Sequence, residues 1–451
     1  GLLGLRIGDE YVQNPGAWFS KHWRVEQVQT AVRYLVNDIV ANYSTRFPNA
    51  PFFATGFQFN SESPTVRDFQ PMISSAHERR QHLERILTVY REQCLPLAFV
   101  ADLCGASVPA LMEELSRPDG DKPLYVEWAD DERRRASRDA ARARGATVLT
   151  RSALATAQAF DFLPLLARDR QCIAPRSLRD ELRGELTEAE EHVRDGWKVL
   201  AASDQGFAIH EREPGHPDLV RRRDSVRALL EWADANVAFV PRPLEAFGDS
   251  RLNGRDMRKR LGESSHDALE LALYYPAVLY SDDLGLRRLA DGLNAKSFAT
   301  PAFVQVAAEH GWMSGQALDR LLVTLAERHF NSLEASPEML LEALSPGRSM
   351  RARDETFALL AGPSMDVLSA ARTVVRAVKA GALRTLKITT TEQLVTHGLV
   401  AMALKFPLPS ILRAMITVAD AELALLQNDL RAVKGACAAF KKSRTGSLPR
   451  L

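Results

Sequence analysis

Short apolar runs alternate with longer amphipathic segments through the middle of the chain. The runs 146–150, 171–174, 237–240 and 277–280 are apolar or β-branched, which is typical of strands buried on both faces. Apolar residues in the intervening segments recur at three- and four-residue spacing, so we predict helices from Ser152, from near Ser177, and over 218–236, 263–275 and 284–292. Strands that alternate with helices predict an α/β fold, a parallel sheet with helices on both faces.

The two ends of the chain follow the helical period. Apolar positions from Trp18 to Ile39 predict one amphipathic helix over 18–43, started by Pro15 and Gly16. Further helices are predicted at 76–93 and 106–116, and helical periodicity returns over 301–441. A β-hairpin is expected from 197–201 and 206–210. We therefore expect mainly helical regions at 11–144 and 331–451 around an α/β domain at 145–330.

Composition places the protein among ordinary globular chains. The 451 residues carry 58 Lys and Arg against 57 Asp and Glu, a net charge of +1, so the whole-chain charge does not indicate a nucleic-acid partner. The longest apolar stretch, 271–280, has ten residues and contains Pro276, whereas a bilayer needs about 20. The four cysteines form no C-x-x-C pair, which predicts reduced core thiols in a cytoplasmic protein. Because the sequence starts at Gly1 and not at Met, we expect a piece of a longer protein.

Acidic residues cluster near the ends of the predicted strands. Asp282 and Asp283 directly follow the strand 277–280, and Glu181 lies early in the helix after 171–174. Glu263 and Asp267 are four residues apart, on one face of the helix that leads into 277–280. Each acid alone is typical of a solvated surface group. Strands that are neighbours in a parallel sheet, however, bring such residues together at its carboxyl edge, where ligands bind.

Carboxylates held close together repel, so some of them take up protons or a divalent cation neutralises them. Mg²⁺ and Mn²⁺ prefer sites made of oxygen ligands. A cation held there could activate water and stabilise charge on a phosphodiester during cleavage. The predicted site is therefore a metal-dependent one.

Two stretches of sequence resemble the PIN domain family. Residues 262–273 and 278–290, GESSHDALELAL and VLYSDDLGLRRLA, are similar to its "GE…A…LAL" helix followed by a strand and "DD…R..A". The pieces 148–154 and 174–182 are similar to its opening strand and "EL" helix. The resemblance covers about 145–330. It implies a small α/β nuclease that cleaves single-stranded RNA with Mg²⁺ or Mn²⁺.

The resemblance also assigns roles to individual residues. Glu181, Asp282 and Asp283 would be metal-facing catalytic carboxylates, and the middle acid would be Glu263 or Asp267. The family's first acid, an Asp on the opening strand, is replaced here by Thr150, which is followed by Arg151. A hydroxyl adds no negative charge, so this departure weakens the predicted metal site.

A second resemblance lies at the start of the chain. Residues 3–10, LGLRIGDE, are similar to the end of the C-terminal domain of Gre-type transcription factors. Large bacterial proteins join such a domain to a PIN-like domain. This resemblance implies a bacterial conflict or regulatory effector in a transcription-linked context, with RNA polymerase as a possible partner; a homo-oligomer is also open.

Basic residues supply the candidates for RNA binding. Arg258, Lys259 and Arg260 precede Glu263 closely and are our preferred RNA-binding residues, and Arg287 belongs to the "DD…R..A" motif. The runs 132–144 and 221–223 are also rich in arginine. Arginine can bind phosphate through its forked N–H groups, but such runs are more typical of a solvated helix face.

These observations leave two main hypotheses. The leading one is a metal-dependent PIN-like endoribonuclease that uses Glu181, Glu263 or Asp267, Asp282 and Asp283. The alternative is a catalytically degenerate PIN-like module for RNA binding or protein interaction, which Thr150 favours. A scaffold whose helical flanks bind RNA polymerase or another protein is a third possibility.

Overall fold

The computed structural model describes residues 10–16, 19–24, 70–117, 123–143, 145–168, 171–203, 206–243, 246, 255–383 and 388–445. The chain divides into two compact units, residues 1–75 and residues 76–451. The resemblance to a Gre-type domain over 1–10 falls almost entirely outside the described residues.

In the first part, β1 (Glu10–Gly16) and β2 (Phe19–Arg24) form an antiparallel hairpin. The helix predicted over 18–43 is therefore wrong over 19–24, and residues 25–43 lie outside the described residues. The physical reason is local: Pro15 and Gly16, which we interpreted as the start of a helix, end strand β1, and Gly16 pairs with Phe19 of β2 after a register shift that follows Gln13.

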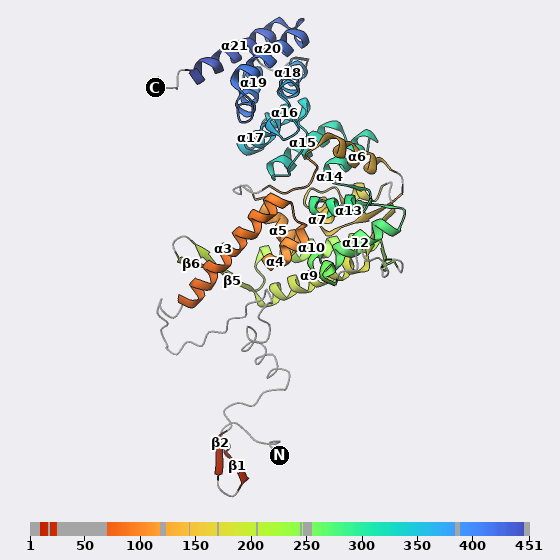
Figure 1. Ribbon diagram of the computed structural model, residues 1–451, viewed down its shortest axis with the longest axis vertical. Helices are drawn as coiled ribbons and strands as arrows, with labels where there is room; N and C mark the ends of the chain where they lie inside the picture. The colour runs from red at the N-terminus through yellow and green to blue at the C-terminus, as the bar shows by residue number, and fades with distance from the viewer. Residues whose placement is uncertain are drawn as a thin grey trace. The chain divides into compact units, whose positions relative to one another are not determined.

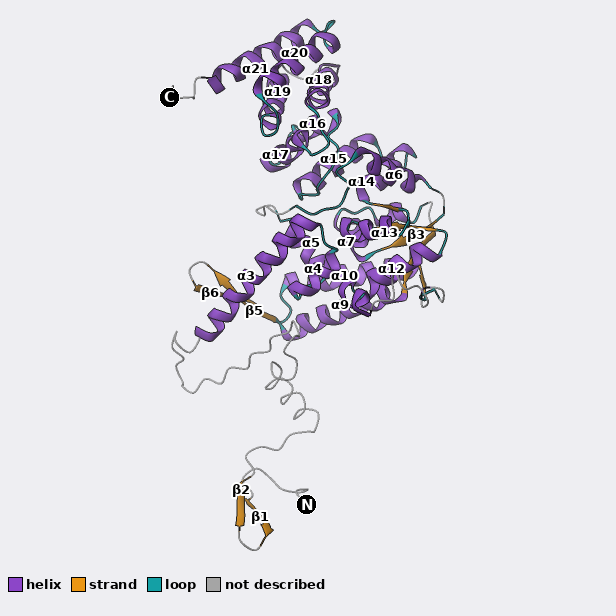
Figure 2. Ribbon diagram, in the orientation of Figure 1, coloured by secondary structure: helices purple, strands orange, loops and turns teal. Residues whose placement is uncertain are grey.

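The second part is built around a five-stranded parallel sheet with strand order β7-β4-β3-β8-β9 (Figure 2). Its strands are β3 (Ala146–Leu149), β4 (Gln171–Pro175), β7 (Val237–Val240), β8 (Ala277–Tyr280) and β9 (Ser297–Phe298). All four predicted strands are confirmed, and β9 is an addition of two residues at the edge.

Helices follow the strands in the predicted alternation (Figure 1). They are α7 (Arg151–Ala159), α8 (Leu163–Leu166), α9 (Arg176–Asp195), α10 (Pro217–Asn236), α11 (Arg255–Leu261), α12 (Glu263–Tyr274), α13 (Leu284–Gly292) and α14 (Thr300–Glu309). The predicted hairpin is confirmed as β5 (Trp197–Ser203) and β6 (Gly206–Arg212).

Side chains on the two faces of the sheet belong to two different hydrophobic cores, because side chains alternate along a strand. Val148, Ile173 and Leu279 pack with α12 and α13 on one face. Leu149 and Tyr280 point the other way, into a larger core shared with α7, α10 and α14. A sheet buried on both faces explains why its strands are continuous apolar runs.

Helices before the sheet join that larger core. They are α3 (Gln70–Gln93), α4 (Leu97–Cys104), α5 (Val108–Leu115) and α6 (Asp131–Arg142). A buried ion pair adds to the apolar contacts: Arg287 of α13 lies 3.1 Å from Glu127 and donates to the Val126 carbonyl at 2.7 Å. Residues of α3 from Ile86 onward, together with α4, α5 and α6, thus pack against the α/β domain.

The C-terminal helices have a core of their own. They are α15 (Gly315–Glu327), α16 (Pro337–Ala343), α17 (Met350–Ala358), η2 (Leu359–Ala361), α18 (Val367–Leu383), α19 (Ile388–Met402), α20 (Leu408–Glu422) and α21 (Gln427–Thr445). Gly398 lets α19 approach α18, because a Cβ at this position would lie 3.1 Å from Val374 Cγ1. Helical periodicity therefore identified this region correctly.

Candidate functional site

Parallel pairing brings the carboxyl ends of three strands to one edge of the sheet. β3 pairs with β4 and with β8, with Val148 opposite Ile173 and Leu149 opposite Tyr280. Thr150, Arg176 and Ser281 directly follow the three strands. The predicted acids on α9, on α12 and after β8 are therefore carried by elements that begin or pack at this edge.

Thr150 is held in a chain of neutral hydrogen bonds. Its hydroxyl donates to the Tyr280 carbonyl at 3.0 Å and, as the N-cap of α7, accepts from the Ala153 amide at 3.4 Å. Ser152 Oγ lies 3.1 Å from the Thr150 hydroxyl and 3.2 Å from that of Ser281. This position joins β3 to β8 through uncharged groups.

Asp282 holds the start of α14. Its carboxylate accepts from the Thr300 amide at 2.7 Å and from the Thr300 hydroxyl at 2.5 Å. The side chain is fully buried, and burial raises the pKa of Asp282 to about 6, although these hydrogen bonds act to lower it. Both carboxylate oxygens therefore already serve as acceptors inside the protein.

Asp283 holds two helix starts. It is the N-cap of α13, accepting from the Leu286 amide at 3.0 Å, and it also accepts from the Leu97 amide at the start of α4 at 2.7 Å. Burial raises the pKa of Asp283 to about 7. The segment 95–97 lies directly on the first turn of α13, because a Cβ on Gly285 would be 2.6 Å from the Leu95 carbonyl oxygen. This segment shields the Asp283 carboxylate from solvent.

The acids of α9 and α12 have different surroundings. Ser177 donates to Asp267 at 2.7 Å, and Ser264 donates to Glu181. Burial raises the pKa of Glu181. Burial also acts to raise the pKa of Asp267, but hydrogen bonds from His266 and Ser177 and the charges of nearby arginines lower it overall. Glu263 is 70% exposed.

Three arginines lie against carboxylates on α9 and α12. Arg242 binds Glu270 through two bonds of 2.5 Å. Arg258 lies 3.4 Å from Asp267, and Arg151 binds Glu185 through bonds of 2.9 and 2.7 Å. Arg242, Glu185 and Glu270 were not predicted from the sequence. A usable signal existed, because Arg151 and Arg242 each lie two residues after a strand ends.

The predicted metal ligands do not form one coordination group. Among the described residues, the His, Cys, Asp and Glu side chains whose ligand atoms lie within 4.8 Å of one another in a group of three are His266, Asp267 and Glu270. Arg242 binds Glu270 and lies 3.8 Å from Asp267, so its guanidinium already supplies the positive charge there. Glu181, Asp282 and Asp283 do not join this group, and the residues present do not fit a shared divalent cation.

The predicted RNA-binding residues do not lie together on one surface either. Lys259 and Arg260 are exposed on α11, and the Arg258 side chain is 35% exposed. Arg287 is fully buried, where it binds Glu127, the Val126 carbonyl and the Ser137 hydroxyl. Lys259 and Arg260 face solvent, whereas Arg287 stabilises the fold.

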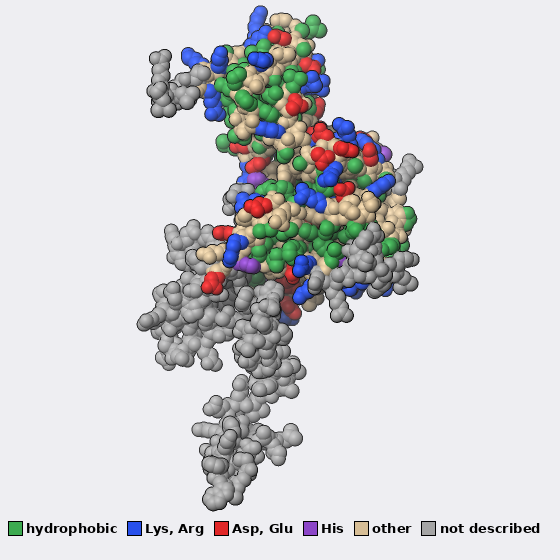
Figure 3. Space-filling view, viewed as in Figure 1, with side chains coloured by type: hydrophobic (Ala, Val, Ile, Leu, Met, Phe, Trp, Pro, Cys, Tyr) green, Lys and Arg blue, Asp and Glu red, His purple; other side chains and the backbone are tan. Residues whose placement is uncertain are grey.

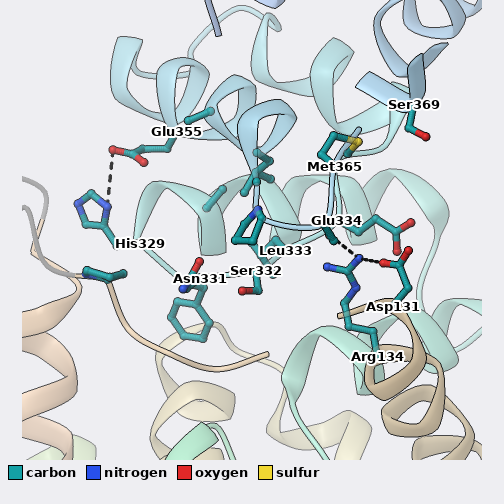
Figure 4. Close-up of a pocket in the computed structure, with 18 of the residues that line it drawn as sticks. Asp131, Arg134, His329, Asn331, Ser332, Leu333, Glu334, Glu355, Met365 and Ser369 are labelled. Carbon is teal, nitrogen blue, oxygen red and sulfur yellow. Dashed lines mark hydrogen bonds and ion pairs between the residues drawn. The ribbon is translucent and has the colours of Figure 1, made fainter. Parts of the chain in front are cut away.

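A cavity of about 290 Å³ lies away from the sheet edge, between α6 and the C-terminal helices (Figure 4). Arg134 and Asp131 form an ion pair on one side, and His329 lies 3.6 Å from Glu355 on the other. The acidic side chains Glu334 and Asp366, which also line it, are bound by Arg138 and by Ser369, and none of the predicted site residues lines the cavity.

The fold and the edge geometry together define the class of this region. A five-stranded parallel sheet covered by helices on both faces, with acids on the helices after β4 and before β8, is consistent with a PIN-like α/β fold. Residues 148–292 match a family model described as the PIN domain associated with the TPR-GreAB-C-PIN system, so they form a PIN-like domain of that system. No curated protein and no solved structure matches the chain.

PIN domains generally use divalent metals. The contacts of Thr150, Asp282 and Asp283 therefore matter, because they decide whether these side chains are available to a metal. Within the described part of the chain, no helix is both long and apolar enough to cross a membrane.

Proposed function

We propose that the PIN-like domain is catalytically degenerate and binds single-stranded RNA without cleaving it. The observation that carries this proposal is the sheet edge itself. Thr150 stands where the family has its first acid, and Asp282 and Asp283 are buried acceptors for three backbone amides. A nuclease of this type needs carboxylates that are available to a cation.

Arginine supports the same proposal. Arg242 and Arg258 lie where charge neutralisation by a metal would be expected, and a guanidinium group satisfies carboxylates without a metal. Lys259 and Arg260 add exposed positive charge on α11, beside α12. Positive side chains bind the RNA backbone by displacing counterions, so binding of this kind weakens as salt rises.

The test compares RNA binding with RNA cleavage in the whole chain. We expect a labelled single-stranded RNA to bind in fluorescence anisotropy and to stay intact with Mn²⁺. The Lys259→Ala/Arg260→Ala variant should bind more weakly, and its salt slope should fall by about 0.7 for each phosphate that the variant no longer neutralises. Arg372→Ala/Arg413→Ala, two exposed arginines of the C-terminal helices, is the matched control and should bind normally.

A second candidate function is a metal-dependent endoribonuclease. It is favoured by two hydrogen bonds between α9 and α12. Ser177 of α9 donates to Asp267 of α12, and Ser264 of α12 donates to Glu181 of α9. If Mn²⁺ produces cleavage that Asp282→Asn abolishes, this candidate replaces the first. Equal, absent cleavage in both proteins, with RNA binding retained, supports the degenerate module.

The system to which residues 148–292 belong suggests a transcription-linked setting for this binding. Its description couples a PIN domain to TPR and Gre-type C-terminal segments, and residues 3–10 resemble the latter. RNA polymerase is therefore a partner to test. Co-purification of polymerase with the whole chain, lost when residues 1–24 are deleted, would support this setting, and retention after the deletion would refute a role for that segment.

A further inference from the structure

The C-terminal helices pack as stacked hairpins, α16–α17, α18–α19 and α20–α21 (Figure 1). Each hairpin packs against the next: α16 lies against α18 and α18 against α20, while α17 lies against α19 and α19 against α21. In such an array every hairpin covers a face of its neighbour, and the last one keeps a face that no further hairpin covers. In the described part of the chain, that face belongs to α20 and α21.

We call this surface the terminal face. On both helices its exposed residues recur at three- and four-residue spacing, so they lie on one side of each helix. An ion pair of 2.6 Å between Asp420 and Lys434 joins the two sides. The terminal face consists of Arg413, Ile416 and Asp420 of α20, Leu425 of the turn, and Arg431, Lys434, Ala438 and Lys442 of α21.

The junction between the last two hairpins shows which chemistry this array uses. Glu422 of α20 lies 3.3 Å from Arg376 and 3.5 Å from Lys379, both on α18. Asp429 of α21 accepts from the Thr391 hydroxyl of α19 at 3.3 Å. The earlier hairpin therefore supplies the donors at this junction, and the later hairpin supplies the acids.

The terminal face repeats the donor side of that junction. Arg413 and Arg431 are exposed and form no ion pair within the described residues, and Lys442 adds a third positive charge. The one acid of the face, Asp420, is paired with Lys434. The end of a helical array only has to be polar, so an excess of one sign indicates a partner of the opposite sign.

Aliphatic side chains accompany these charges. Ile416 is 38% exposed and Leu425 is 97% exposed, and hydrophobic side chains gather beside Lys and Arg over the C-terminal helices in Figure 3. Single-stranded RNA stacks its bases on aromatic rings, but among the described residues of α20 and α21 no aromatic side chain is exposed. Aliphatic groups among positive charges instead fit a helix whose apolar stripe is flanked by acids.

We propose that the terminal face binds an acidic amphipathic helix of a partner protein, in the position that a further hairpin of the array would occupy. The acids of that helix pair with Arg413, Arg431 and Lys442, and its apolar stripe packs on Ile416 and Leu425. Two copies of this chain do not pair through this face, because both faces are positive and repel. The face does not include α11, so the proposal does not depend on RNA binding.

The test measures binding of a labelled synthetic peptide to the whole chain by fluorescence anisotropy. The peptide is built from Glu and Leu so that a helix has one apolar stripe, and a scrambled peptide of the same composition has none. We expect the first peptide to bind and the scrambled one to bind about tenfold more weakly or not at all.

Arg413→Glu/Arg431→Glu should weaken binding of the first peptide by about tenfold or more, since two attractive charges become repulsive. Arg135→Glu/Arg372→Glu makes the same change in net charge at two exposed arginines outside the face. It is the matched control and should bind the peptide normally.

Ile416→Ser tests the apolar contact without a change of charge and should weaken binding by about fivefold. The melting temperature of all these variants should stay close to that of the unmodified protein, because the changed side chains are exposed. The proposal is overturned if the peptide does not bind, if the scrambled peptide binds equally well, or if Arg413→Glu/Arg431→Glu and Ile416→Ser leave binding unchanged. Loss of single-stranded RNA binding in Arg413→Glu/Arg431→Glu would also overturn it, because RNA would then occupy this face.

Discussion

Two groups of carboxylates at the same sheet edge have opposite surroundings. Asp282 and Asp283, after β8, are fully buried and accept hydrogen bonds from the starts of three helices. Glu181 and Asp267, on α9 and α12, are held by serine hydroxyls and face arginines. The first group holds the starts of helices, whereas the second forms a polar cluster in which the buried Asp267 faces Arg258.

This difference shows that an acid past a strand end has two possible uses. If the next helix starts there, the carboxylate satisfies backbone amides that otherwise lack partners. If the chain continues and a cation or arginine is near, it takes part in a charged site. Asp283 has the first use, because segment 95–97 places the Leu97 amide on its carboxylate.

We expect the largest effect from breaking the buried ion pair between Arg287 and Glu127, which lies in the same region as the first group. Arg287→Ala leaves Glu127 charged and buried without its partner, and loss of one partner of a buried ion pair costs about 3–5 kcal/mol. We expect this loss in the free energy of unfolding measured with urea. Arg260→Ala, at an exposed arginine, is the control and should change it by less than about 0.5 kcal/mol.

Asp283→Ala should have the next largest effect. It removes the cap of α13 and leaves the amides of Leu97 and Leu286 without their acceptor, which should cost about 2–3 kcal/mol. Glu263→Gln, at the exposed acid that begins α12, should be nearly neutral in the same urea titration. Equal destabilisation by the two variants would remove the distinction between the groups.

The pH dependence of stability offers a third comparison. Burial raises the folded-state pKa of Asp283 to about 7, well above that of an unfolded aspartate, so the folded protein binds the extra proton. Its stabilising contribution is complete at a pH below the unfolded pKa and is lost as the pH rises towards 7.

We expect the free energy of unfolding to fall by about 2–3 kcal/mol between pH 5 and pH 7.5 from this group. Asp283→Asn should flatten that slope, whatever its effect on the absolute stability. The control Glu263→Gln should keep the slope of the unmodified protein. An unchanged slope in Asp283→Asn would mean that the carboxyl group does not titrate in this range.

The smallest expected effect lies in the second group. Ser177→Ala removes one hydrogen bond to Asp267, which Arg258 continues to face. We expect a loss of about 1 kcal/mol in stability, together with an Asp267 pKa that rises because a stabilising donor is gone. NMR titration of the aspartate would measure it, and an unchanged pKa would show that the arginines alone set its charge.

The local elements of the α/β domain were predictable because each depends on nearby sequence. The runs at 146–149, 171–175, 237–240 and 277–280 are apolar over one strand length, and the intervening helices repeat every three or four residues. The start of the chain was not predictable in this way, since the apolar spacing from Trp18 onward fits a helix although residues 19–24 pair with β1 as a strand.

The surroundings of the site could be predicted only in part. The carboxyl edge follows from parallel strands, and the cap at Asp283 follows from an acid directly before a helix. The contacts that separate the two groups are long-range in sequence: Leu97 on Asp283, Ser177 on Asp267 and Arg242 on Glu270. No local pattern reports which distant side chain arrives at a carboxylate.

Manganese binding is the most direct test of whether the two groups of acids act apart. Added Mn²⁺ would be followed by electron paramagnetic resonance, in which bound and free Mn²⁺ give different signals. The geometry predicts that the ion stays free at concentrations close to that of the protein. Tight binding that disappears in Asp267→Asn and equally in Asp282→Asn would contradict it, because it would place one residue of each group on the same cation.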